Sequence, residues 1–258
     1  MLGALALAAM PLASTAGEPR ILGDKEFYTK GSFIAWAGSW SVDVPGSPAY
    51  KRGVDYADEI AVHPETFPAN VELSWHWPLT PPKVTGVYAY NAVSYGSYDG
   101  GVPATPITPR QVKDIHTLSE NFRCTMARPV GDYNALTEFF LASKSNGEGK
   151  VAEIGFLLRI AKSGLAFANA GEQLGVFTDA SGRAWKVAKQ GAPAGPYYMF
   201  LPEGEITEGT VDFKGALDFL RAKGRITGEE WFTGLAFGVE PTEGSGSLKL
   251  EKLEVSYQ

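Results

Sequence analysis

Apolar residues alternate with polar or small ones in several short runs of this chain, and a period of two is typical of strands that bury one face. The run VAEIGFLLRIA, at residues 151–161, places Ile154, Phe156 and Leu158 on one face and Glu153 on the other. The second face also carries a glycine, which leaves its backbone bare. We therefore expect a strand with a strongly apolar core face and a carboxylate on the opposite face.

A second run, GLAFGVEP at residues 234–241, repeats this arrangement. Leu235, Phe237 and Val239 fall on one face, whereas Glu240 follows an alanine and a glycine on the other. Bare backbone lets something large come close, and a carboxylate beside it is placed to act on that partner. The pattern predicts a second strand that ends in an acid, followed by a rigid turn at its proline.

Short apolar runs punctuated by Gly and Pro occupy much of the remaining chain, at residues 21–61, 70–101, 133–143, 186–213 and 247–257. Only one segment, residues 212–224, has apolar residues at helical spacing, and it ends at a glycine. We find no internal repeat and no linker. The chain is therefore predicted to be all-β, a sandwich of two antiparallel sheets with one short helix, with residues 17–258 in a single domain.

The composition agrees with this fold and adds one candidate ligand. The chain has 258 residues, with 30 Gly, 17 Pro, 14 Phe, 11 Tyr and 6 Trp. Glycine and proline supply the turns that join many strands, and aromatic residues are common within strands. Aromatic rings also line clefts that stack on sugar rings, so a carbohydrate is a candidate ligand.

Charge and metal-binding residue types argue against several other classes. The net charge is −6 and the chain has no basic stripe, which argues against a nucleic-acid partner. The single cysteine, Cys124, cannot form an internal disulfide, and we interpret it as a small buried apolar residue because no histidine lies in its segment. His63, His76 and His116 are too widely spaced to suggest a metal site. We infer no metal and no cofactor.

The first 16 residues form an apolar run that ends in small residues. The run is interrupted by Pro11 and is too short to span a bilayer as a mature anchor. A secretory signal peptide cleaved near Ala16 fits this pattern, although a positively charged start is missing. The alternative is a frayed apolar N-terminus. We expect a secreted protein, extracellular or periplasmic, that is free of the membrane after cleavage and works as a monomer.

Glu153 and Glu240 suggest a function only when they are considered as a pair. If their strands belong to one curved sheet, both acids project into its concave side. Paired carboxylates across a cleft are what glycosidic bond cleavage requires, because one protonates the departing oxygen while the other attacks or activates water. The alternative is that both are ordinary solvated glutamates on strand surfaces.

Three segments, AEIGFLL, AFGVEP and the final GSLKLEKLEVSY, resemble glycoside hydrolase family 12, the endoglucanases and xyloglucan hydrolases of β-jelly-roll fold. The family's nucleophile opens a Glu-x-Met-x-Trp strand, and its acid/base stands in a Gly-x-Glu-Pro stretch near the C-terminus. The resemblance implies that Glu153 is the nucleophile and Glu240 the acid/base of a retaining enzyme. It also implies that Glu138, in LTEFF, takes the place of a family Asp that holds and tunes the nucleophile.

The same resemblance supplies candidate sugar-binding residues. Trp75 and Trp77 of SWHWP and Tyr90 of VYAY match the family's Trp-x-Trp and Val-x-x-Tyr strands, and Tyr95 lies further along the same run. Trp36, in FIAWAGSW, echoes the family's Asn-Asn-x-Trp-Gly segment. We expect these rings to stack on sugars, with a core tryptophan as the alternative for Trp36.

The chain departs from the family pattern after the nucleophile, where Gly155 and Leu157 replace Met and Trp. The smaller residues predict room beside Glu153 for a bulkier, decorated chain such as xyloglucan. We therefore expect a retaining endo-β-1,4-glucanase that acts on cellulose, mixed-linkage glucan or xyloglucan. The alternative is a non-catalytic carbohydrate-binding jelly roll, which the lost Met and Trp favour and the two retained acids oppose.

Overall fold

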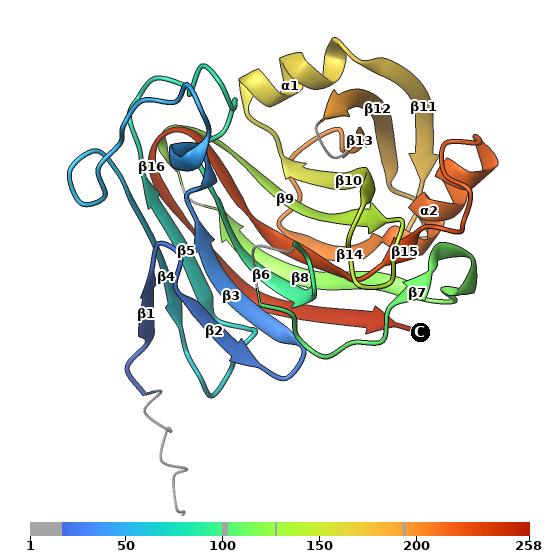
Figure 1. Ribbon diagram of the computed structural model, residues 1–258, viewed down its shortest axis with the longest axis horizontal. Helices are drawn as coiled ribbons and strands as arrows, with labels where there is room; N and C mark the ends of the chain where they lie inside the picture. The colour runs from blue at the N-terminus through green and yellow to red at the C-terminus, as the bar shows by residue number, and fades with distance from the viewer. Residues whose placement is uncertain (1–16, 100–102, 127, 193–194) are drawn as a thin grey trace, which may run out of the picture.

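Figure 1 shows the computed structural model, which describes residues 17–99, 103–126, 128–192 and 195–258. Its strands form two curved layers, an inner sheet with an open concave face and an outer sheet behind it. The prediction of an all-β jelly roll is confirmed. The predicted signal peptide, residues 1–16, lies outside the described residues. Within the described part of the chain, no helix has the length and apolarity needed to cross a bilayer.

The inner sheet is built around the first half of β16 (Gly234–Tyr257). On one side of this strand the sheet continues through β6, β3 and β2, and on the other side through β9, β10, β13, β12 and β11. These strands are β2 (Phe27–Lys30), β3 (Phe33–Gly38), β6 (Tyr90–Gly96), β9 (Val130–Ala142), β10 (Lys150–Arg159), β11 (Glu172–Thr178), β12 (Ala184–Ala192) and β13 (Gly195–Leu201).

The outer sheet is built around the second half of β16, which pairs with β5 on one side and β8 on the other. β4 and β1 extend the sheet beyond β5, and β14 extends it beyond β8. The bounds are β1 (Arg20–Gly23), β4 (Ala57–Val62), β5 (Val71–His76), β8 (Leu118–Met126) and β14 (Glu208–Asp212). Short strands β7 (Arg110–Gln111) and β15 (Trp231–Phe232) pair with each other, and β15 pairs with the end of β9.

One strand pair departs from the predicted antiparallel arrangement. β10 and β13 run parallel, with Glu153 opposite Tyr197 and Gly155 opposite Met199. Parallel neighbours need a long connection, and here the chain passes through a helix and the β11–β12 hairpin before β13 returns beside β10. The prediction of purely antiparallel sheets is therefore wrong at this pair.

A bend in β16 carries the chain from one layer to the other. We predicted two separate strands here, whereas the structure has one strand of 24 residues with an irregular register between Pro241 and Glu243. Gly244, at φ 76°, follows the irregularity, and a side chain there would meet the carbonyl oxygen of Val130. Glu240 therefore lies at the bend of a continuous strand and not at a strand end.

The predicted helix is confirmed as α2 (Phe213–Ala222), and the Asp212 side chain caps it by accepting a hydrogen bond from the Gly215 amide at 2.8 Å. A second helix, α1 (Lys162–Asn169), and the strands β8 and β11 were not predicted. α1 is only eight residues long and contains Gly164, so its sequence carries a weak helical signal. Two 3-10 turns, η1 (Trp40–Asp43) and η2 (Val112–Asp114), complete the helical elements of the described residues.

The faces predicted for the two glutamate-bearing strands are confirmed. Ile154, Phe156 and Leu158 of β10 and the alternate residues of β16 from Leu235 to Val239 lie in the main core between the layers. A second, smaller apolar cluster covers the concave face of the inner sheet and includes Trp36, Tyr90, Leu157 and Met199. Cys124 is buried in the main core, as predicted, and burial raises the pKa of its thiol to about 12.

One carboxyl group is buried in the main core itself. Glu120 of β8 is fully buried, and the hydroxyl of Thr137 donates a hydrogen bond of 3.2 Å to its Oε2 atom. Its Oε1 atom has no partner among the described residues. Burial raises the pKa of Glu120 to about 8, so this carboxyl is protonated at neutral pH.

Candidate active site

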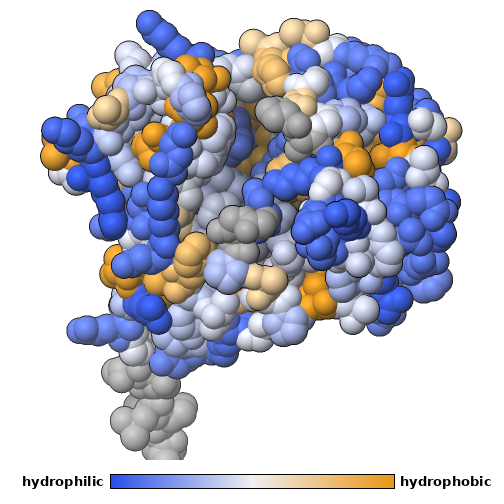
Figure 2. Space-filling model, viewed as in Figure 1, coloured by the Kyte–Doolittle hydropathy of each residue, from blue (hydrophilic) through white to orange (hydrophobic). Residues whose placement is uncertain are grey.

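A cavity of about 590 Å³ opens on the concave face of the inner sheet, and besides Asp43 and Asp99 three glutamate carboxyl groups line it. They belong to Glu138 on β9, Glu153 on β10 and Glu240 on β16. Figure 2 shows this side of the molecule hollowed between α1 and the strands on the left. The structure therefore brings the two predicted acids and the predicted neighbour of Glu153 into one site.

Glu153 is half-buried and points into the cavity. Its pKa is raised to about 7, first by burial and next by the charge of Glu240. A hydrogen bond with Glu138 and the positive charge of Lys150 oppose this rise. Glu153 is therefore substantially ionised at neutral pH, as a nucleophile must be.

Glu138 supports Glu153 from the neighbouring strand. It is 3% exposed and accepts a hydrogen bond from the Tyr98 hydroxyl through Oε1. Burial and then the nearby charge of Glu153 raise the pKa of Glu138 well above its usual value. Glu138 consequently keeps its proton and donates it in the hydrogen bond to the Glu153 carboxylate.

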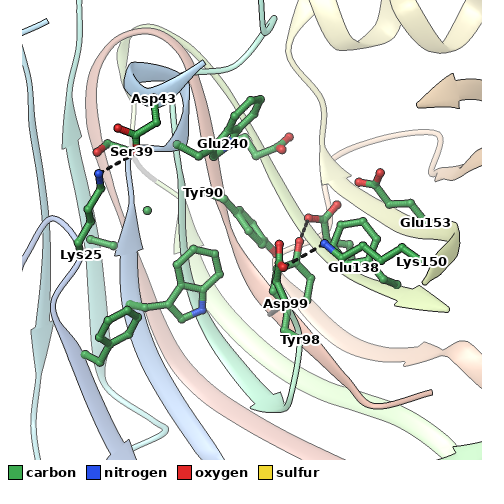
Figure 3. Close-up of a pocket in the computed structure, with 16 residues that line it drawn as sticks. Lys25, Ser39, Asp43, Tyr90, Tyr98, Asp99, Glu138, Lys150, Glu153 and Glu240 are labelled. Atoms are coloured by element: carbon green, nitrogen blue, oxygen red, sulfur yellow. Dashed lines mark hydrogen bonds and ion pairs between the residues drawn. The ribbon is translucent and has the colours of Figure 1, made fainter. Parts of the chain in front are cut away.

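Glu240 lies two strands away from Glu153, and Figure 3 shows the two carboxyl groups pointing toward one another. The side-chain amide of Asn134 donates a hydrogen bond of 3.0 Å to Glu240 Oε2. The orientation of that amide is determined by its own oxygen, which accepts from the Ala161 backbone N–H at 2.8 Å. Burial, and then the charge of Glu138, raise the pKa of Glu240 to about 8. At neutral pH Glu240 is therefore mainly protonated and is suited to be a general acid.

A rigid wall of aromatic rings faces the carboxyl groups. Trp36 stacks on Tyr98 with ring centroids 5.9 Å apart, and its indole N–H donates to the Ser94 hydroxyl at 2.6 Å. The Tyr90 hydroxyl donates to the Ala236 carbonyl oxygen at 2.8 Å. Both predicted residues, Trp36 and Tyr90, thus line the cavity, together with Tyr98, which we had not singled out.

The other three predicted aromatic residues lie outside the cavity. Trp75 is 3% exposed in the main core, and Trp77 is enclosed between the rings of Tyr56 and Tyr88, at 4.2 and 4.5 Å. β5 belongs to the outer sheet, so Trp75 on its inward face meets the core and not the groove. The predicted stacking role of Trp75 and Trp77 is therefore wrong.

The prediction for Tyr95 is wrong for a different reason. It lies on β6 with Tyr90, but five residues further on, so its side chain leaves the opposite face of the sheet. There it packs against the main core and contacts Tyr257 with ring centroids 6.4 Å apart. The predicted sugar-binding role of Tyr95 is wrong as well.

A second cavity, of about 420 Å³, shares Trp40 and Glu240 with the first. We call the first cavity the charged arm of a groove, because its lining includes Lys25, Asp43, Asp99, Glu138, Lys150 and Glu153. The second is the apolar arm, because its lining includes Val84, Leu157, Ile160, Phe167, Tyr197 and Met199, and Glu240 is its only charged residue among those described. Glu240 stands at the junction of the two arms.

Trp40 lines both arms of the groove and is 40% exposed, and it had no place in the sequence prediction. It belongs to the 3-10 turn η1, four residues after Trp36. A large apolar ring exposed at the junction of two cavities is a natural stacking surface for a sugar. The only signal in the sequence was a tryptophan in the segment GSWS, where the pattern of a strand had already ended.

The extra room predicted at Gly155 is filled by another side chain. A Cβ atom added to Gly155 would lie 2.3 Å from the hydroxyl oxygen of Tyr197, and 2.9 Å from the nearest ring carbon. The phenol of Tyr197 therefore occupies the space that Gly155 leaves. The prediction of extra room is therefore wrong at Gly155, whereas Leu157 lines an open cavity and the preference for a decorated chain stays a prediction.

Neither a protein-family model nor a curated protein sequence matches the chain. Solved structures do. Endoglucanase 3 of Trichoderma harzianum, from glycoside hydrolase family 12, has a TM-score of 0.72 at 18% identity over 95% of this chain and 100% of its own. The family 12 xyloglucanase of Bacillus licheniformis has a TM-score of 0.70 at 16% identity, over 93% of this chain and 100% of its own. A metagenome-derived family 12 endoglucanase has a TM-score of 0.70 at 20% identity, over 93% of this chain and 98% of its own. The chain thus shares their fold over its described length.

Proposed function

We propose that this protein is a divergent member of glycoside hydrolase family 12 and hydrolyses β-1,4-glucans with retention of configuration. One observation carries the proposal: Glu153 and Glu240 face each other in one groove, each beside its own hydrogen-bond partner, Glu138 and Asn134. Glu153, with a pKa of about 7, is bound to a protonated Glu138, whereas Glu240, with a pKa of about 8, keeps its proton longer. Two carboxyl groups held in different states are what acid-assisted glycoside cleavage needs.

In the proposed reaction, Glu153 attacks the anomeric carbon while Glu240 gives its proton to the departing oxygen, and a glycosyl-enzyme ester forms. Glu240, now ionised, then takes a proton from water, which attacks the same carbon and releases Glu153. Asn134 holds Glu240 in place, and Glu138 keeps Glu153 oriented through their shared proton. Glu138 is a positioning residue in this scheme because it acts through Glu153.

The substrate class follows from the groove and from the structural neighbours. Cavities extend on both sides of Glu240, which supports cleavage within a chain and not only at its end. The neighbours are described as endoglucanases and xyloglucanases, so the candidate substrates are cellulose-type, mixed-linkage and decorated β-glucans. We further propose that the protein is exported, as its first 16 residues suggest, and acts as a monomer.

Release of reducing sugar from a panel of soluble β-glucans tests this proposal. We expect activity on at least one glucan and its loss in Glu153→Gln, which keeps the shape of the side chain but removes the nucleophile. Proton NMR of the first product should show the β-anomer. Initial α-anomer would refute the assignment of both acids, and tight oligosaccharide binding without any hydrolysis would favour the non-catalytic alternative.

A further inference from the structure

Tyr197 comes to the groove from β13, a strand that joins the inner sheet through its parallel pairing with β10. The register places Tyr197 directly opposite Glu153, so both side chains leave the same face of the sheet. Tyr197 lines the apolar arm, whereas Glu153 lines the charged arm. The phenol therefore lies on the bottom of the groove, in the apolar arm and on the strand next to the one that carries Glu153.

The position of the phenol depends on the absence of a side chain at residue 155. Its hydroxyl oxygen and two ring carbons lie at 2.3, 2.9 and 3.0 Å from where the Cβ of any other residue at position 155 would be. Gly155 pairs with Glu138 on its other side. Tyr197 and Gly155 thus form one unit, in which a residue 42 positions later in the sequence supplies the surface that residue 155 itself does not.

The hydroxyl of Tyr197 is available to a ligand. Among the described residues it has no hydrogen-bond partner, in contrast to Tyr90 and Tyr98, whose hydroxyls donate to Ala236 and Glu138. Burial and the charges of Glu138, Glu153 and Glu240 raise the pKa of Tyr197 well above its usual value. The phenol is therefore a neutral hydrogen-bond donor across the physiological pH range.

We propose that Tyr197 is a specificity-determining residue that donates a hydrogen bond to the sugar unit bound beside Glu153. This inference rests on the proposed function and deepens it. A phenol in place of an apolar shelf requires that the sugar unit present a free oxygen to the bottom of the groove. The substrate class is therefore a β-glucan whose unit at the cleavage point is unsubstituted on that side, with any decoration carried by other units.

Tyr197→Phe tests this role because it removes only the hydroxyl. We expect kcat/KM on the best glucan of the panel to fall roughly tenfold, the effect of one lost hydrogen bond to a neutral group, while the melting temperature stays within about 2 °C. The matched control is Tyr95→Phe, a tyrosine of the same sheet on the face away from the groove. An active parent with Tyr197→Phe within about twofold of it would overturn the inference and leave the proposed function intact.

The glycine supplies a second, independent test. Gly155→Ala should displace the phenol and lower kcat/KM further than Tyr197→Phe, and combining Gly155→Ala with Tyr197→Ala should relieve the clash. Equal effects of Gly155→Ala in the parent and the Tyr197→Ala background would mean that the two residues do not act as a unit, and would count against the inference.

Binding separates this inference from the proposed function. Calorimetry with cello-oligosaccharides on Glu153→Gln and on Glu153→Gln/Tyr197→Phe needs no turnover. Weaker binding by the double variant would support Tyr197 even if the parent hydrolyses nothing, which would refute the proposed function alone. Equal binding by the two variants would overturn the role of Tyr197.

Discussion

The two arms of the groove meet at Glu240 but offer a ligand very different surroundings. In the charged arm, Lys150 forms an ion pair of 3.0 Å with Asp99 and lies over the ring of Phe140. In the apolar arm, exposed apolar side chains such as Val84 and Phe167 dominate, at 52% and 46% exposure. Figure 2 shows apolar atoms gathered over α1, the helix that carries Phe167.

The polar groups of the apolar arm are largely engaged within the protein. The Thr85 hydroxyl donates to the Val87 carbonyl at 2.7 Å, and the Asn134 amide is bound at both ends. A carboxyl facing such surroundings is poorly solvated, which favours its protonated form. The difference between the arms therefore explains why Glu240 keeps its proton and why Glu153, with a lysine nearby, is the group that ionises first.

The largest effect is expected for Glu240→Ala, which removes the carboxyl group at the junction of the two arms. If Glu240 is the acid of the proposed reaction, the variant should lose about 10³-fold in kcat on glucans, and least on aryl glycosides whose leaving groups need no proton. Azide should restore turnover by replacing water as the acceptor. Both effects are measured by initial rates with and without azide. Glu254→Ala, an exposed acid on the same strand, is the control; comparable losses on all leaving groups would contradict an acid role.

Glu120 lines neither arm of the groove, so it tests whether burial alone keeps a carboxyl group protonated. Its folded pKa of about 8 exceeds the value of about 4.5 expected when unfolded, so the folded state binds the extra proton and the unfolding free energy falls as pH rises through this interval. Glu120→Gln should reduce the change in unfolding free energy between about pH 5 and pH 9 by a few kcal/mol. Urea unfolding followed by tryptophan fluorescence measures it. An unchanged pH dependence would exclude Glu120 as its source.

Lys150→Met removes the cation of the charged arm. Because Lys150 opposes the rise in the pKa of Glu153, its loss should raise that pKa further and move the acid limb of the rate profile to higher pH. The parent should be most active between about pH 7 and pH 8, the values for Glu153 and Glu240. At about pH 6 the variant should lose roughly threefold to tenfold relative to the parent. Lys25→Met, at the other end of the charged arm, is the control and should leave the acid limb of the pH–rate profile unchanged. An equal shift of the acid limb in both variants would count against a local effect of Lys150.

The smallest expected effect concerns the apolar arm. Phe167→Ser should raise KM for glucans roughly threefold, with kcat nearly unchanged, because it removes apolar contact area that serves binding alone. Val176→Ser is the control, since it replaces another exposed apolar residue, on β11 and outside the lining of the groove. A fall in kcat without a change in KM would show that the apolar arm takes part in the chemistry.

The sequence predicted what depends on neighbouring residues and failed where distant strands meet. Alternation within β10 and β16 was enough to place Glu153 and Glu240 on the concave face. Whether β5 joins the inner or the outer sheet depends on its pairing with the far half of β16, so Trp75 was misplaced. The place of Tyr197 in the groove could not be predicted for the same reason, because only the register between β10 and β13 brings it over Gly155. Trp40 was missed because a four-residue 3-10 turn has no period to detect.

The continuity of β16 has a consequence for how this chain folds. Its first half is the central partner of β6 and β9, and its second half is the central partner of β5 and β8. All four partners precede it in sequence, β5 by more than 150 residues. During synthesis, both layers therefore lack their middle strand until β16 emerges, and loop-closure entropy must be overcome before these pairings form. We expect folding to be slow and to expose unpaired strand edges until β16 is in place.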